Sequence, residues 1–325
     1  MTAPRSDGLD AAERDMLVRA AVLAPSMHNT QPWRFRFRGY TVEVHTDPRY
    51  ELPVEDPERR MLLIGSGAAV FNLRVAAARL GYDAAVALHD ATDRTLVAEV
   101  QLGSLSHGGR AALADLYPYL ARRRTSRAPF TAEPVPLAVR MTLVAAAADE
   151  NAMLEWVVEP DRRDWLLRLT AEANLAEGTD PERTAERRQW VGGTRDREGV
   201  PSASLGPRPR RPSAPVRDLA ADQSDHQRAT DSFEAEAALG VLATRYDTPR
   251  SWLVAGQALE RVLLVATRHG VSASLLNQAV EHAELRWLIR DPLTGWSEPQ
   301  AVLRFGYGPA APPTPRRPIE EFVDD

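Results

Sequence analysis

The sequence predicts an α+β fold made of two fused repeats, with antiparallel or mixed sheets packed against helices. Along the 325 residues, apolar side chains recur with the periods of both helices and strands. The chain also repeats itself, because residues 67–81 match residues 256–270 at a constant offset of 189. Identical residues stand at these paired positions: Gly67/Gly256, Ala69/Ala258, Ala77/Ala266, Arg79/Arg268 and Gly81/Gly270.

The first predicted element is a helix from about Asp10 to Leu23. Asp10 and Glu13 have the spacing of a capping box, in which each side chain accepts a hydrogen bond from the other residue's backbone N–H. Pro25 ends the helix, because proline lacks the N–H that another turn would need.

A hairpin and a long helix come next. Residues 33–45 alternate apolar and polar side chains on both sides of Gly39, which is typical of an antiparallel hairpin with one buried face. A helix is expected from about Pro57 to Leu80, with Gly81 as its stop. A short helix at 111–120 and a strand at 301–305 are expected further along the chain.

The second repeat contains an insertion. The segment around Trp156 resembles the loop and strand around Trp33 at an offset of 123, and this offset has grown to 189 at Gly256. Residues 178–228 hold six prolines and ten arginines but few large apolar residues, so they cannot form a compact core by themselves. The segment is either a disordered loop or a lid, anchored at one end by Arg187, Arg188 and Trp190.

The composition excludes several kinds of site and partner. A net charge of -5, from 40 basic and 45 acidic residues, gives no overall attraction to nucleic acid or to an anionic membrane. The chain has no cysteine and no lysine, which excludes thiolate chemistry and a Schiff base, and leaves arginine to grip any phosphate. Its seven histidines lack the spacing of a metal site. Without an apolar stretch near ~20 residues, we expect a cytoplasmic protein.

Residues 122–130 combine several guanidinium groups with two hydroxyls in an irregular connection. A bound FMN would need cations at its phosphate, hydroxyl partners for its ribityl chain and a positive group at the N1/O2 edge of its ring. Arg122, Arg123 and Arg124 could contact the phosphate. Thr125 and Ser126 could contact the ribityl chain, and Arg127 is the candidate for the N1/O2 edge. Near the C-terminus, Arg316 and Arg317 could reach the same phosphate, although an isolated arginine cluster is more often a solvated patch.

The loop 25–33 offers further polar groups at close spacing. The amides of Asn29 and Gln31 can both donate and accept, as the uracil-like edge of a flavin demands, although the loop could also simply cap the helix before it. His28 is a candidate proton donor, but a lone histidine in a turn is more often structural. Trp33 is expected to pack in the core beneath the loop.

The pair Gly65 and Gly67 does not indicate a dinucleotide-binding site. The third glycine of that fingerprint is missing, since Val70 stands in its place, and the preceding residues have a helical pattern. Because Gly67 recurs as Gly256, we expect close packing of two helices at these glycines instead.

Three motifs resemble the nitroreductase superfamily, and more closely its Acg-like FMN-binding branch: residues 24–33, residues 122–130 and residues 315–323. The resemblance implies a nitroreductase-like layered fold and an FMN site shared between two halves. Carried over residue by residue, it implies phosphate, ribityl and N1/O2 contacts from Arg123, Arg124, Thr125, Ser126 and Arg127. It also implies a ring loop of Pro25, Ser26, Met27 and Asn29, an N5/O4 segment at Asn277 and Gln278, and C-terminal phosphate contacts from Arg316 and Arg317.

Nitroreductases are typically homodimers with FMN at the interface, so the repeat implies a dimer fused into one chain. We expect a first half at 1–105 and a second half at 106–325, with the insertion at about 178–228. The first half has only Arg5 where the second has its arginine cluster, and the second half has lost the polar loop of the first. One FMN per chain and a monomer are therefore expected.

The resemblance implies an oxidoreductase that passes hydride from NAD(P)H through flavin N5 to a nitroaromatic or quinone-like acceptor. No side chain is expected to act as a catalytic acid or base, and Arg127 would stabilise the reduced ring. The alternative is a flavin-sequestering protein whose insertion closes over the ring and shuts out nicotinamide. A third alternative, an arginine-rich nucleic-acid module, is disfavoured because acidic residues outnumber basic ones.

Overall fold

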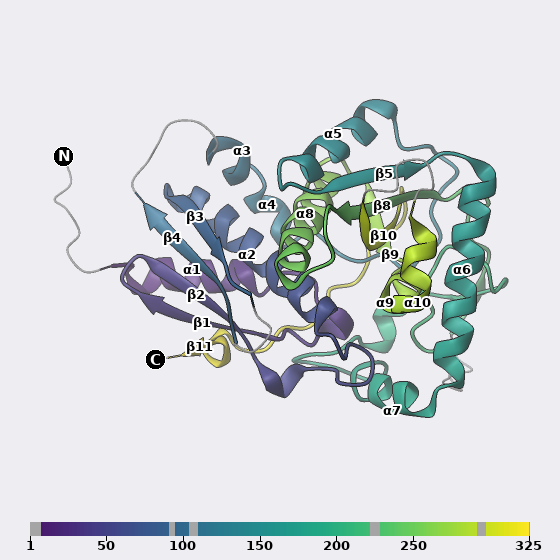
Figure 1. The fold of residues 1–325 in the computed structure, drawn as a ribbon, viewed down its shortest axis with the longest axis horizontal. Coiled ribbons are helices and arrows are strands. Elements are labelled where there is room, and N and C mark those ends of the chain that lie inside the picture. The colour runs from purple at the N-terminus through teal and green to yellow at the C-terminus, as the bar shows by residue number, and fades with distance from the viewer. Residues whose placement is uncertain (1–7, 91–94, 104–109, 222–227, 291–296, 325) are drawn as a thin grey trace.

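Two sheets flank a central pair of long helices in the computed structural model (Figure 1). The structure describes residues 8–90, 95–103, 110–221, 228–290 and 297–324. The first sheet has the strand order β11-β1-β2-β4-β3, with β1 (Trp33–Arg38), β2 (Thr41–Thr46), β3 (Asp83–Leu88), β4 (Leu96–Gly103) and β11 (Val323–Asp324). The second has the order β5-β8-β10-β9, with β5 (Met153–Val157), β8 (Ala238–Thr244), β9 (Ser272–Leu275) and β10 (Glu298–Gly306).

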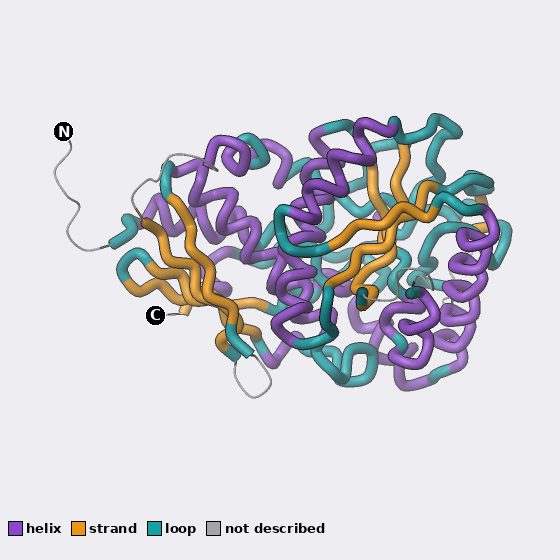
Figure 2. Tube along the Cα trace, turned by 45° about the horizontal axis from the view of Figure 1, so that its top comes forward, coloured by secondary structure: helices purple, strands orange, loops and turns teal. Residues whose placement is uncertain are grey.

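Helices cover both sheets and fill the space between them (Figure 2). The first half contributes α1 (Ala11–Ala21) and α2 (Arg60–Leu80), and α3 (Arg110–Ala114) and α4 (Tyr117–Leu120) follow its sheet. The second half contributes α5 (Leu137–Ala148), α6 (Pro160–Thr179), α7 (Pro181–Trp190), α8 (Pro249–Arg268), α9 (Gln278–Glu281) and α10 (Ala283–Arg286).

The two halves share one connectivity. The order α1-β1-β2-α2-β3-β4 in the first half corresponds to α5-β5-β8-α8-β9-β10 in the second. Within each half the equivalent strands pair in the same order, and every one of these pairs is antiparallel. The predicted α+β fold of two fused repeats is confirmed.

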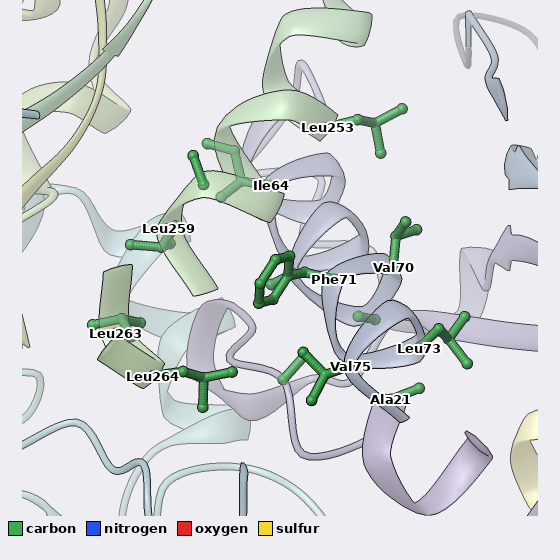
Figure 3. Packing of buried hydrophobic residues seen from close by; sticks show 14 of the residues in the cluster. Ala21, Ile64, Val70, Phe71, Leu73, Val75, Leu253, Leu259, Leu263 and Leu264 are labelled. Carbon is green, nitrogen blue, oxygen red and sulfur yellow. The ribbon is translucent and has the colours of Figure 1, made fainter. Parts of the chain in front are cut away.

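The helices α2 and α8 meet through a reciprocal pair of glycines. A Cβ on Gly67 would lie 2.2 Å from the carbonyl oxygen of Leu253, and one on Gly256 would lie 2.0 Å from that of Ile64. The offset of 189 relates Ile64 to Leu253 as it relates Gly67 to Gly256, so the contact is the self-complementary kind found across a two-fold axis. Between the two helices lies Phe71 of α2, which is fully buried (Figure 3).

The ends of the first two helices follow from their caps. The capping box at Asp10 and Glu13 is present, and α1 begins at Ala11. The long helix α2 begins at Arg60 and not at Pro57, because Arg59 has a left-handed backbone and Asp56 accepts the N–H groups of the next turn, those of Met61 and Leu62. Gly81 ends α2 in the left-handed conformation, as predicted, with φ 96°.

By length and composition, α2 is the one helix among the described residues that could cross a membrane. It is almost wholly buried inside the protein, and its apolar side chains join a core that also contains residues of α1, α8 and both sheets. Its apolar character is therefore explained by its central position in the fold.

The insertion lies between β5 and β8 and is longer than predicted. It begins directly after β5 with α6, whose buried residues pack against the second sheet, and continues with α7 and the short strands β6 (Arg208–Pro209) and β7 (Thr230–Asp231). In the described part of 178–228, Val191, Val200, Leu205, Leu219 and Ala220 form a small apolar cluster. That part is folded onto the rest of the protein, whereas residues 222–227 and the predicted boundary between 105 and 106 lie outside the described residues.

Candidate functional site

Two adjoining cavities lie between the halves. The apolar cavity is lined by Pro25, Ser26, Met27, His28, Met61, Ile64, Gly65, Thr125, Arg127, Arg217, Leu219, Leu259, Leu275, Asn277 and Glu281. The cationic cavity is lined by Pro25, Ser26, His28, Asn29, Arg123, Arg124, Thr125, Arg127, Val200, Ser204, Pro312, Thr314 and Arg316. They share five residues, so the polar loop of the first half and the arginine segment of the second half line one composite site.

The polar loop has a constrained backbone between α1 and β1. His28, Asn29 and Gln31 all have positive φ angles, of 48°, 60° and 55°. The Ser26 hydroxyl accepts the N–H of Gln31 at 2.9 Å, which closes the loop on itself. Gly65 allows the loop to pack closely against α2, because a Cβ at this position would make a tight contact, 3.3 Å from the Pro25 carbonyl oxygen. Together these contacts hold the loop against α2.

The arginine segment is positioned by the second sheet. Thr125 pairs with Ala273 of β9, and the N–H of Ser126 donates to the Ala273 carbonyl at 2.9 Å. This pairing directs Thr125 and Arg127 into both cavities. Ser126 itself is buried, and neither cavity includes it.

Several guanidinium groups crowd the cationic cavity. Burial, followed by the charges of Arg123 and Arg124, lowers the pKa of Arg316 to about 9, although Glu260 acts in the opposite direction. Burial and the charge of Arg123 also lower the pKa of Arg124. An anion in this cavity would offset both the energetic cost of burying the cations and their mutual repulsion.

Glu260 of α8 is a fully buried carboxylate beside these cations. Its Oε1 lies 3.4 Å from Nε of Arg123. Burial raises the pKa of Glu260 to about 7, because the opposing effects of Arg123, Asn72 and Arg316 are smaller. A proton can therefore join or leave this group near neutral pH.

The apolar cavity is a slot between the two long helices and the insertion. Ile64 of α2 and Leu259 of α8 supply apolar walls, and Arg217 and Leu219 come from the insertion. Arg217 donates to Glu281 at 2.7 Å, and that ion pair is buried. Burial lowers the pKa of Arg127 to about 10, with smaller contributions from the charges of Arg217 and Arg228.

Six predicted contacts differ in the structure, including that of Ser126 described above, although Asn29 still lines the cationic cavity. Arg122 is exposed and stacks on Tyr119, and Gln278 is buried outside both cavities. Arg317 turns away from both cavities, and its guanidinium lies 3.5 Å from the ring centroid of Tyr50. The amides of Asn29 and Gln31 are engaged within the protein: that of Asn29 donates to the carbonyls of Gly199 and Pro315 and accepts from Arg316, and that of Gln31 donates to the Arg197 carbonyl. Both amides therefore fasten the insertion to the loop.

The remaining candidates of the sequence analysis lie on the cavities: Pro25, Ser26, Met27, Asn29, Arg123, Arg124, Thr125, Arg127, Asn277 and Arg316. The sequence analysis missed the lining residues of α2 and α8 and those of the insertion. Arg217 and Leu219 stand in the segment 216–220, where Val216, Leu219 and Ala220 bring apolar side chains into the proline- and arginine-rich composition, and this was the available signal.

A buried ion network joins the polar loop to the insertion. His28 Nε2 lies 2.6 Å from Oε2 of Glu55, and both side chains are almost fully buried. Arg187 of α7 donates to Glu55 and to Glu177 of α6, each at 2.9 Å. Glu177 also lies 3.3 Å from Arg217, so the network returns to the apolar cavity.

Curated relatives cover nearly the whole chain. A Mycobacterium tuberculosis protein that carries the name of an NAD(P)H nitroreductase is 33% identical over 324 residues, which span 97% of this chain and 92% of that protein. Another protein of the same organism, named as the NAD(P)H nitroreductase Acg, is 30% identical over 316 residues, or 94% and 93% of the two chains. No protein-family model matches the chain.

Solved structures with similar backbones include a nitroreductase with bound FMN from Desulfitobacterium hafniense. It has a TM-score of 0.40 and 13% identity, and the match covers 65% of this chain and 97% of that one. An NADPH:FMN oxidoreductase from Vibrio harveyi, complexed with NAD+, has a TM-score of 0.39 and 14% identity, with 65% and 76% covered.

Proposed function

The chain belongs to the family of NAD(P)H nitroreductases that includes Acg, and on that premise we propose that it is an FMN-dependent oxidoreductase with one composite site. The donor would be NAD(P)H, and the acceptor a small nitroaromatic or quinone-like molecule. The observation that carries the proposal is the cationic cavity, in which arginines from distant parts of the chain converge beside an apolar slot.

The residues present fit the phosphate of FMN. Arg123, Arg124 and Arg316 surround the cationic cavity, and the depressed pKa values of Arg124 and Arg316 reflect first their burial and then the repulsion between the cations, which an anion would offset. The hydroxyls of Thr125 and Thr314 face the same cavity and would serve the phosphate or the ribityl chain. Guanidinium groups suit this task, because they bind phosphate oxygens in pairs.

The residues of the apolar cavity fit the flavin ring. Aliphatic side chains such as Ile64 and Leu259 form a slot for a flat ring, and Arg127 supplies a cation at the junction with the cationic cavity. Bound FMN would supply two-electron hydride chemistry. Arg127 would stabilise the negative charge that reduction places on the N1/O2 edge of the ring.

We further propose that the chain holds one FMN and is a monomer in the cytoplasm. The loop that corresponds to the polar loop in the second half contains Glu150, which forms ion pairs with Arg74 of α2 and Arg261 of α8. These ion pairs join the loop of Glu150 to α2 and α8. The loop and the two helices would have to separate to make room for a second, symmetry-related site. The contact between α2 and α8 lies within one chain and takes the place of the two-fold contact between the subunits of a dimer.

A flavin-sequestering protein is the second candidate function. The observation that favours it is the position of the insertion, because Val200, Ser204, Arg217 and Leu219 line the two cavities. The Asn29 amide donates to the Gly199 carbonyl at 2.9 Å, so the insertion is fastened across the polar loop. In this function the insertion would keep nicotinamide away from the ring.

An absorbance experiment distinguishes the two functions. The full chain is reconstituted with FMN, freed of excess ligand, and titrated without oxygen with NADH, NADPH and then dithionite. Bleaching of the 450 nm band by a nicotinamide supports the oxidoreductase, and bleaching by dithionite alone supports sequestration. Protein that retains no flavin after reconstitution contradicts both.

A further inference from the structure

We propose that His28, held by Glu55, is the acid that delivers the proton accompanying hydride transfer to the acceptor; this inference rests on the proposed function. His28 lines both cavities, at the junction between the apolar slot and the cationic pocket. Its side chain is only 2% exposed, so little bulk water reaches the imidazole in the closed site. A proton needed inside this site has to come from a side chain or from trapped water.

Glu55 fixes the orientation of the imidazole. Nε2 of His28 lies 2.6 Å from a carboxylate oxygen of Glu55, while Arg187 donates to the other oxygen at 2.9 Å. Burial by itself would raise the pKa of Glu55, but His28 and Arg187 outweigh it and hold that pKa at about 2. The ionised carboxylate accepts the Nε2–H, so Nδ1 is the nitrogen left to pass a proton to an acceptor.

The other charged groups that face the apolar cavity are Arg127, Arg217 and Glu281, and the last two are engaged with each other in a buried ion pair. Arg217 is tied to Glu281 at 2.7 Å and to Glu177 at 3.3 Å, and these carboxylates raise its pKa despite its burial. Arg127 has a pKa of about 10 and so remains a cation at neutral pH. Among the described residues that line this cavity, His28 is the only imidazole, the side chain that exchanges protons near neutral pH.

The backbone keeps the imidazole in place. His28 and Asn29 both have left-handed backbone angles, which side-chain-bearing residues adopt where their surroundings enforce them. The Asn29 side-chain amide donates to the Gly199 carbonyl of the insertion and accepts from Arg316. The guanidinium of Arg183 donates to the backbone carbonyl of Glu55. Both partners of the His28–Glu55 pair are thus fixed from several sides.

The proposed step conserves atoms and electrons. Bound FMN would supply the hydride, that is two electrons and one hydrogen, and His28 would supply the proton that the developing oxyanion of a quinone acceptor needs. The product is the hydroquinone, and the neutral imidazole regains its proton from water. Transfer of a proton by a positioned side chain typically contributes about 10²- to 10⁴-fold to such a rate.

The test is a rapid-mixing experiment on the FMN-loaded full chain after reduction with dithionite, which avoids any dependence on nicotinamide. Reoxidation is followed at 450 nm between pH 6 and 9 with p-benzoquinone, which must be protonated, and with ferricyanide, which accepts electrons alone. We expect His28→Gln to slow the quinone reaction roughly 100-fold. We expect it to slow the ferricyanide reaction far less than the quinone reaction and to leave the FMN content close to that of the unmodified protein. The melting temperature should fall, because the buried Glu55 loses a charged partner.

The matched control is His89→Gln, because His89 forms a similar pair with Glu99, at 2.8 Å, on the first sheet and lines neither cavity. It should change no rate. The unmodified protein should also show a solvent isotope effect with the quinone and none with ferricyanide, so the proposal is testable even if the variant folds poorly.

Three results would overturn the role of His28 without touching FMN binding. These are equal quinone rates in His28→Gln and the unmodified protein, an equal loss of both the quinone and ferricyanide rates, and an unmodified protein that reacts with ferricyanide only. A protein that binds no FMN would instead contradict the proposed function itself.

Discussion

Arg127 is the residue that we propose to act most directly on a bound flavin. Its guanidinium donates to the Ser204 carbonyl at 3.0 Å and lies where the two cavities meet. A fixed cation at this point stabilises negative charge without any rearrangement when the charge forms. Its effect should therefore appear in the reduction potential more than in the affinity for oxidised FMN.

The variant Arg127→Ala should lower the two-electron midpoint potential of bound FMN by about 30 mV or more, since about 30 mV corresponds to about 1.4 kcal/mol for two electrons. Equilibration with reference dyes measures the potential. Arg122→Ala is the control, because Arg122 is exposed on Tyr119 and lines neither cavity. An unchanged potential in Arg127→Ala would remove the role assigned to this residue.

Glu260 gives the protein a pH-dependent stability in the absence of FMN. Its pKa rises from an ordinary value of 4.5 to about 7 in the folded state, so the folded protein binds the extra proton between these limits. The free energy of unfolding should then fall as pH rises from about 4.5 to 7, at up to about 1.4 kcal/mol per pH unit.

Glu260→Gln should flatten this part of the stability profile, as measured by urea unfolding of FMN-free protein from pH 4.5 to 8. Some slope should remain, because burial also raises the pKa of Asp56 to about 7. A profile for Glu260→Gln that falls as steeply as that of the unmodified protein would show that Glu260 does not bind the proton.

The residues of the site were predictable to the extent that their chemistry is local. The segment from Arg123 to Arg127 and the polar loop are recognisable because their cations, hydroxyls and prolines are close in sequence. Ile64 and Leu259 look like ordinary core residues in the sequence, since nothing local distinguishes an apolar cavity wall from a packed interior. The burial of Arg317 against Tyr50 depends on residues far away in the chain and had no sequence signal.

At the level of elements, the contact between α2 and α8 depends on two glycines. Gly67→Ala would place a methyl group 2.2 Å from the Leu253 carbonyl oxygen, so one helix would have to move. Overpacking of this kind typically costs about 1–3 kcal/mol. We expect that loss of unfolding free energy by urea denaturation.

Gly103→Ala is the matched control, because a Cβ on Gly103 meets nothing within 4 Å and this glycine has no left-handed backbone angle. It should leave stability nearly unchanged. If Gly67→Ala were as stable as Gly103→Ala, the close approach of α2 and α8 would not hold in solution.

The elements themselves followed well from sequence patterns where one local signal dominates. The capping box of α1, the hairpin of β1 and β2 and the glycine stop of α2 were predicted because each depends on neighbouring residues. The sequence analysis placed the start of the insertion too late. α6 belongs to the insertion but has an ordinary helical sequence, so nothing in its composition marked it as inserted. Its folded part could not be foreseen, since its order depends on ion pairs such as that of Arg187 with Glu55.

For the whole molecule, we expect one FMN per chain and a monomer. Flavin released by heat from purified, reconstituted protein measures the stoichiometry, and light scattering after size exclusion measures the mass. Two FMN per chain would show that the ion pairs of Glu150 do not close the second site. A dimer would show that the contact between α2 and α8 within one chain does not replace a contact between two chains.

The smallest strand of the first sheet has a consequence for synthesis. β11 pairs in parallel with β1, and Arg34 bonds to Asp324 across 290 residues of sequence. A ribosome making this protein therefore releases β1 long before β11, and one edge of β1 stays unpaired in the meantime. The nascent chain has to keep that edge from joining other polypeptides until residues 323 and 324 emerge and cover it.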